Sequence, residues 1–187
     1  MRILVSLASP LIAAWCQAER VLDAQKAFAL PVIARLLFLV TLLDFFIKSA
    51  LTKFGDGALG FLTPSAGAFA QIFPKRAEAV LYNTSEIGIF EWVIIMLGTY
   101  GELILPILIV VGLATRLASL AMIGFILVMS IVDVAGHGVA LGALLDGNPG
   151  SIVPDQRLFW CMPLLVLVFM GAGRLSLDQM LFAPKRR

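Results

Sequence analysis

The stretch TYGELILPILIVVGLATR, Thr99–Arg116, decides the fold because it joins an apolar helix to a tight turn. From Trp92 to Leu113 the only charged residue is Glu102, and about 20 apolar residues suffice for a helix to cross a bilayer. The turn is so short that the next apolar run must lie antiparallel beside this helix. A carboxylate within such a helix costs about 2.5 to 3.5 kcal/mol on insertion scales, so Glu102 needs a partner or a function.

The composition agrees with a membrane protein. The 187 residues are 60% hydrophobic and 14% charged, with a mean hydropathy of +0.99. Soluble domains are about 45–50% apolar and about 25% charged, so a polytopic membrane protein is the class that fits. The charged residues are spread along the chain and sum to +2, so we expect contact with membrane lipid and none with nucleic acid.

The sequence carries no recognisable catalytic or metal-binding motif. Cys16 and Cys161 form no CxxC pair, and a single histidine cannot supply a bis-histidine haem site or a self-contained metal site. Nucleotide-binding and metalloprotease motifs are also missing from the sequence. We therefore assign no catalytic residue and no metal ligand.

Four segments have the length and composition of membrane-spanning helices. They cover approximately residues 31–53, 87–113, 116–136 and 157–173. They predict an all-α fold, a membrane-embedded antiparallel four-helix bundle within residues 31–181, followed by a basic tail at 182–187. In the long connection after the first segment, Pro74 suits the first turn of a short surface helix.

The first 30 residues are predicted to form a separate N-terminal segment. The apolar run from Ile3 to Trp15 is too short to cross the membrane. A weak signal peptide is one interpretation, and an amphipathic helix retained at the membrane surface is the one we favour.

The distribution of basic residues predicts the orientation. With the N-terminus in the cytoplasm, nine basic residues lie on the cytoplasmic side and five on the other. The nine are Arg2, Arg20, Lys26, Arg35, Arg116, Arg174, Lys185, Arg186 and Arg187, and the five are Lys48, Lys53, Lys75, Arg76 and Arg157. The excess predicts that both termini are cytoplasmic.

Charged residues inside the first and second segments are candidates for a polar pocket. Asp44 and Lys48 are four residues apart and share a helix face, as an internal ion pair or as part of that pocket. Glu91, Gly98 and Glu102 form one narrow stripe on the second segment. Pro106 removes a backbone donor and leaves the carbonyl of Glu102 without its helical partner, which adds a polar spot at mid-membrane depth.

Two interpretations of Glu102 remain open. It is protonated or paired with a cation from another helix, or it has a functional role. The third segment adds Asp133 and His137, which are again four residues apart and are either satisfied interface groups or part of a polar vestibule. The complete candidate pocket consists of Glu102, Lys48, Asp44, Glu91, Lys53, Asp133 and His137.

Three motifs, in this order and spacing, resemble the DoxX family of small four-helix membrane proteins. The central one is ELILPILIVVGLATRLASL, which begins at Glu102. The second, SALTKF at 49–54, is similar to the end of the family's first helix, near whose start Arg35 lies. The third, GAGRLSLDQML at 171–181, resembles the family's terminal motif. The resemblance covers approximately residues 31–181.

This resemblance implies a four-helix bundle in the cytoplasmic membrane of a bacterium and a link to respiratory or sulfur redox systems. We therefore expect a membrane subunit or accessory protein of a quinone-linked redox complex, with quinone as its cofactor, nothing bound covalently, and electrons supplied by a protein partner. The matched polar residues include Lys53 and Glu102. Those expected to pair charges or support the structure are Arg35, Arg116, Arg174 and Asp178.

The alternative is a non-enzymatic scaffold or conduit that partners a metal- or stress-homeostasis protein. In that case Glu102 pairs with Arg35 or another cation and holds the bundle together. The sequence leaves open whether the protein is part of an enzyme and whether it forms a homo-oligomer.

Overall fold

The computed structural model describes residues 2–182, with side chains from residue 12 onward. This part of the chain is all-helical and contains no strand, which confirms the predicted class. In chain order the elements are α1 (Arg2–Phe38), η1 (Leu39–Leu43), α2 (Asp44–Leu51), η2 (Gly60–Leu62), α3 (Ala66–Ile72), α4 (Pro74–Ala79), η3 (Thr84–Glu86), α5 (Ile89–Val111), α6 (Thr115–His137), α7 (Asp155–Met170) and α8 (Leu177–Phe182).

Three helices are long and apolar enough to cross a membrane, which indicates a membrane protein. They lie within Ile12–Leu51, Ile89–Val111 and Thr115–His137. The fourth expected span, 157–173, corresponds to α7, which is not one of these three helices. α7 has 16 residues and ends before Gly171, whose φ of +77° lies outside the helical region.

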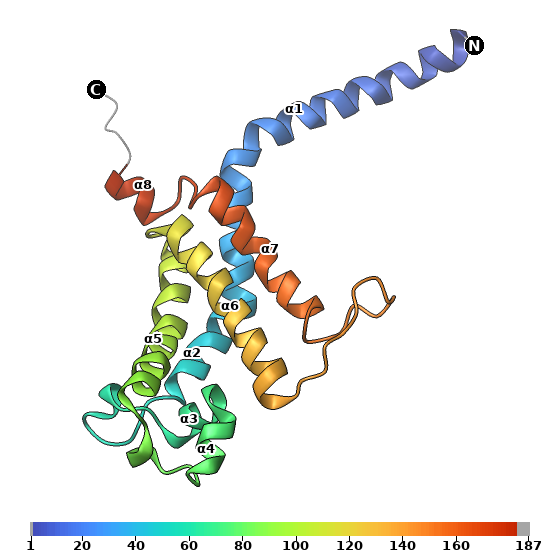
Figure 1. Ribbon diagram of the computed structural model, residues 1–187. Helices are drawn as coiled ribbons and strands as arrows, with labels where there is room; N and C mark the ends of the chain where they lie inside the picture. Colours follow the sequence, from blue (N-terminus) through green and yellow to red (C-terminus); the bar gives the residue numbers. More distant parts are fainter. Residues whose placement is uncertain (1, 183–187) are drawn as a thin grey trace.

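The first helix is continuous across the expected boundary at residue 30, and its first half runs away from the rest of the molecule (Figure 1). Within the bundle it contains a π-helical turn, η1. The buried residues Phe38, Leu42, Phe46 and Ala50 follow one another at intervals of four. Four residues of an α-helix turn by about 400°, which is about 40° more than a full turn, so residues at this spacing would move gradually around the helix. The wider π turn compensates part of this rotation and keeps them on one face.

The helices pack in a ring in which each is antiparallel to the one before it (Figure 1). α2 packs on α5, α5 on α6, α6 on α7, and α7 returns to α1. Aromatic rings fill much of the centre: Phe46 stacks with Phe38 and meets Phe125 and Trp160 edge-on. The ring closes around one apolar core.

A small helical layer covers one end of the bundle. α3 and α4 lie there in the connection between α2 and α5 (Figure 1). Ala68, Phe69 and Ala77 form a second apolar cluster with Ile95 of α5. Pro74 is the first residue of α4, which confirms the short helix predicted from it.

Polar contacts tie the opposite end together around the turn between α5 and α6. Arg35 donates to the carbonyls of Ile109 and Val110 at the end of α5, and to those of Ala172 and Leu175 beyond α7. The bonds to the end of α5 satisfy a carbonyl, that of Val110, which the helix end leaves without a backbone partner, and the bonds to Ala172 and Leu175 hold the connection after α7 against it. Arg35 therefore serves this end of the bundle and is not the partner of Glu102.

Asp178 caps the helix that follows the same turn. Its carboxylate accepts hydrogen bonds from the backbone N–H groups of Ala114 (2.6 Å) and Thr115 (3.0 Å) at the start of α6. Its own N–H donates to the carbonyl of Gly112. The terminal motif thereby fixes the direction in which the chain enters α6.

Candidate functional site

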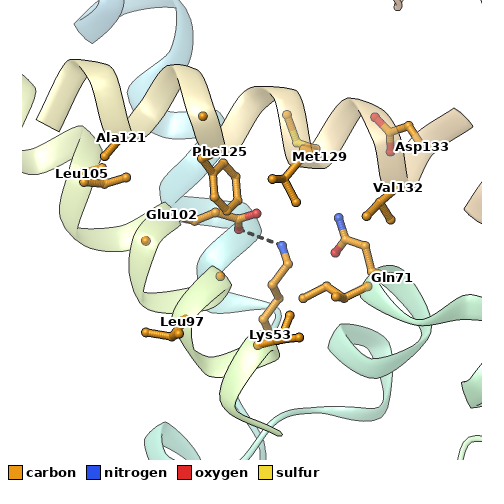
Figure 2. Close-up of a pocket in the computed structure, with 16 residues that line it drawn as sticks. Lys53, Gln71, Leu97, Glu102, Leu105, Ala121, Phe125, Met129, Val132 and Asp133 are labelled. Atoms are coloured by element: carbon orange, nitrogen blue, oxygen red, sulfur yellow. Dashed lines mark hydrogen bonds and ion pairs between the residues drawn. The ribbon is translucent and has the colours of Figure 1, made fainter. Parts of the chain in front are cut away.

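The candidate site is a cavity of about 380 Å³ between α5 and α6 (Figure 2). Lys53, which follows α2, and Gln71 and Ile72 of α3 complete its wall. Most of the lining is apolar, and its polar members are Lys53, Gln71, Glu102 and Asp133. A largely apolar cavity with a few polar groups is typical of small-molecule sites.

Small residues on both helices make room for the cavity. Gly98 and Gly101 on α5 face Ala121 and Gly124 on α6. A Cβ atom added at Gly101 would lie 3.8 Å from the ring of Phe125, and one added at Gly124 would meet nothing within 4 Å. The space therefore results from side chains that are missing on both walls.

A buried ion pair lies on one side of the cavity (Figure 2). Lys53 Nζ and Glu102 Oε2 are 2.7 Å apart, and their side chains are only 3% and 4% exposed. Lys53 also donates to the hydroxyl of Ser49 (2.6 Å) and to its carbonyl (3.2 Å). All three ammonium protons therefore have an acceptor.

The second oxygen of Glu102 has no partner in the described part of the chain. Oε2 binds Lys53, whereas Oε1 has no hydrogen-bond partner among the residues whose side chains the structure describes. Glu102 lines the cavity, and its Oε1 atom is not completely enclosed by protein atoms. The pair thus presents an acceptor to the cavity, and its donors are already occupied.

The far side of the cavity carries a second ion pair. Asp133 lies there, next to Val132 on α6 (Figure 2), and accepts a hydrogen bond of 2.7 Å from Arg157 of α7. The guanidinium of Arg157 stacks on Trp160, with its carbon 4.3 Å from the ring centroid. This pair fixes the carboxylate of Asp133 against α7.

Two predicted pocket residues lie outside the cavity. Asp44 and Lys48 bond to each other at 2.7 Å with side chains that are 78% and 74% exposed. Each lies two residues from Phe46, which is buried, and two residues turn a helix by about 200°. Their placement in the pocket was wrong because they occupy the opposite face of α2; the alternative of an internal ion pair is the one found.

Glu91 and His137 are also absent from the lining. Glu91 accepts from the N–H of Gly88 at the start of α5 and forms an ion pair with Arg76 at 3.3 Å. His137 Nε2 lies 2.8 Å from the carbonyl oxygen of Gln71. Both fasten the small helical layer to the bundle, so their placement in the pocket was wrong as well.

Three of the seven predicted residues, Lys53, Glu102 and Asp133, do line one cavity. Four further lining residues were not predicted: Gln71 and Ile72, which reach the cavity from the long connection, and Phe125 and Met129 on α6. In the sequence, Gly124 could have indicated this cavity, because a glycine within an apolar helix often marks a close approach or a space.

No family model matches this chain, and neither the curated proteins nor the solved structures contain a match to it.

Proposed function

We propose that this chain is a membrane subunit of a quinone-linked redox system and that the cavity between α5 and α6 holds the quinone ring. The observation that carries the proposal is Oε1 of Glu102, an acceptor with no partner among the described side chains, in a largely apolar cavity. A quinol is an apolar ring with hydroxyl donors, which suits this arrangement. At about 380 Å³ the cavity suits a ring and the first part of its tail.

Glu102 is well placed for proton transfer with such a ring. Oxidation of a quinol to a quinone releases two electrons and two protons: the hydroxyl that donates to Oε1 can pass one proton to that oxygen, and the other hydroxyl releases its proton to water. Both electrons pass to a protein partner, and the reverse sequence returns two protons and two electrons to a quinone. Lys53 holds the carboxylate in position throughout, because its three protons are all bound.

The proposal includes a DoxX-like four-helix bundle in a bacterial cytoplasmic membrane, with α7 as the fourth crossing and both termini inside. α7 supports this, since it packs against both α6 and α1. Its 16 residues span about 24 Å, and the connections at its ends can complete the crossing.

Quinone carried through purification tests the proposal. The protein is purified anaerobically in a mild detergent with a reductant, so that the bound ring stays in the quinol form, and the ring compound is extracted and quantified by mass spectrometry. We expect Glu102→Gln to reduce the amount bound per protein several-fold, because the amide nitrogen, a donor, can replace the acceptor that faces the quinol hydroxyl. Asp44→Asn is the matched control, because it neutralises an exposed carboxylate outside the cavity. Equal quinone in all three proteins, or none in the wild type, contradicts the proposal.

A scaffold function, in partnership with a metal- or stress-homeostasis protein, is the second candidate. The observation in its favour is that Lys53 and Glu102 join α2 to α5 with every ammonium proton bound. A scaffold predicts that Glu102→Gln lowers the thermal stability and changes no ligand content. Loss of quinone in a variant that remains folded favours the redox function instead.

A further inference from the structure

A second cavity, of about 680 Å³, lies at the end of the bundle where α6 begins and α7 ends. Two arginines line it: Arg116 in the first turn of α6, and Arg174 in the connection between α7 and α8. Both side chains are exposed. Neither takes part in the ion pairs found in the described part of the chain.

The backbone around the cavity holds Arg116 close to the end of α7. Gly171 has a φ of +77°, and a Cβ atom added to it would lie 3.3 Å from Nε of Arg116. The acid on the same wall, Asp178, is bound to the backbone N–H groups of Ala114 and Thr115. The two guanidinium groups are therefore available to a negative charge from outside.

Part of the cavity wall is apolar. Met170, Phe182, Ala27 and Ala172 form this part, whereas Ser176 and Gln179 add polar side chains. Large apolar side chains are exposed on and next to α8: Leu175, Met180, Leu181 and Phe182. A short helix with such side chains, placed where the spanning helices end, suits the boundary between lipid headgroups and acyl chains.

We propose that this cavity binds an anionic phospholipid, with the phosphate between Arg116 and Arg174 and an acyl chain along Met170 and Phe182. Guanidinium groups bind phosphate oxygens through paired hydrogen bonds. A basic pocket between helix ends at the membrane surface is suited to a lipid headgroup. The apolar part of the wall, formed by Met170 and Phe182, favours a lipid over free phosphate, because phosphate alone has no apolar group to place against it.

Native mass spectrometry of the detergent-solubilised protein tests this assignment. Phosphatidylglycerol and phosphatidylcholine are added separately, and the dissociation constant of the first bound lipid is measured for each. We expect a preference for phosphatidylglycerol in the wild type, since its headgroup carries no compensating cation. Inorganic phosphate at millimolar concentration should not displace the lipid.

Paired variants locate the site. The double variant Arg116→Gln/Arg174→Gln should bind phosphatidylglycerol about tenfold or more weakly, because each arginine near a lipid surface contributes about a fivefold effect. Arg20→Gln is the matched control, because Arg20 is exposed on α1 and does not line the cavity. Far-UV circular dichroism must show unchanged helicity.

Three outcomes overturn the proposal. Equal affinity for the two lipids in the wild type is one, and it requires no variant. If Arg20→Gln weakens phosphatidylglycerol binding as much as the double variant does, the lipid is attracted to basic residues in general and not to this cavity. Displacement of the lipid by phosphate shows that the cavity binds a soluble anion instead.

Discussion

Glu102 is costly in an apolar helix, and Lys53 offsets that cost. The two charges lie 2.7 Å apart and almost fully buried, so each is the other's main compensation. Removing one partner leaves an unpaired buried charge, whereas removing both leaves none. The stability of single and double variants therefore tests this pairing most sharply.

We expect Lys53→Met to lower the free energy of unfolding by about 3 to 5 kcal/mol, because Glu102 is then buried without a counter-charge. The double variant Lys53→Met/Glu102→Leu should recover most of this loss. Thermal or denaturant unfolding in detergent, followed by circular dichroism, measures both. Lys48→Met is the control from the exposed pair and should have a small effect, of about 0 to 1 kcal/mol. A double variant no more stable than Lys53→Met rules out this account of the pair.

Asp178 makes a pH-dependent contribution at the end of the bundle. Burial alone raises the pKa of its carboxyl group, but the N–H groups of Thr115 and Ala114 and the charge of Arg35 outweigh this effect. The pKa in the folded protein is therefore below the ordinary value. Such a group stabilises the fold above its unfolded-state pKa, and this contribution is lost as the pH falls through the folded-state pKa.

We therefore expect Asp178→Ala to cost about 1 to 2 kcal/mol near neutral pH, as the loss of a helix cap does. The difference from the wild type should shrink below about pH 4, where the carboxyl group of the unfolded chain begins to take up a proton that the folded protein still excludes. Unfolding curves for both proteins between pH 3 and pH 7 measure this difference. A constant difference over that range would indicate that the charge of Asp178 is irrelevant.

At the scale of elements, the turn between α5 and α6 depends on one glycine. Gly112 has a φ of +74°, and a Cβ atom there would lie 2.6 Å from the Cβ of Ser176 and 3.0 Å from Cζ of Arg35. The αL conformation is accessible to glycine at little cost, and the close contacts leave no space for a methyl group.

We predict that Gly112→Ala lowers the thermal midpoint markedly more than Gly138→Ala. Gly138 also has a positive φ, of +68°, but a Cβ atom there meets nothing within 4 Å. Both variants place a side chain at a positive φ, so the difference between their thermal midpoints measures the clash with Ser176 and Arg35. Differential scanning fluorimetry of the two variants is sufficient. Equal thermal midpoints would mean that Ser176 and Arg35 move aside without any loss of stability.

The elements also show how far the sequence could be interpreted. The second and third apolar runs, predicted at 87–113 and 116–136, correspond to α5 and α6 within two residues at each end, because hydrophobic length and a glycine turn mark them. η1 was not predictable, since a π turn depends on packing around Phe46 rather than on local preference. Which face of α2 points inward was missed for the same reason.

The candidate site was predictable only in part. Lys53, Glu102 and Asp133 could be named as unusual charges in apolar surroundings, and they do line one cavity. The sequence could not show which charges pair, because Lys53 and Glu102, like Asp133 and Arg157, lie far apart along the chain. α3 contributes Gln71 and Ile72 to the lining because the long connection between α2 and α5 folds back onto the bundle. Hydrophobic periodicity does not predict how such a connection folds.

At the scale of the whole molecule, the number of crossings determines where the loops lie. If α7 crosses as proposed, the connections after α2 and after α6 share one side of the membrane, and the α5–α6 turn lies on the other. Single cysteines at Asp56, Ala114 and Leu145, which are exposed, report this in intact cells. We make these substitutions in a background without Cys16 and Cys161.

We predict that a membrane-impermeant maleimide labels cysteines at 56 and 145, and labels one at 114 only after the cells are opened. A cysteine placed after Arg187 should behave like the one at 114. If the C-terminal cysteine is labelled in intact cells together with those at 56 and 145, α7 does not cross and the fourth span is excluded.

The central claim is that the cavity between α5 and α6 holds a quinone ring beside Glu102. Photoaffinity labelling with an azidoquinone, followed by peptide mapping, tests it most directly. We predict that the label attaches to cavity residues such as Leu105, Phe125 and Met129. Gly124→Leu, which fills open space without a clash at its Cβ, should remove the label from a protein that remains folded. Label confined to the outer faces of the helices, or unchanged in Gly124→Leu, would contradict the claim.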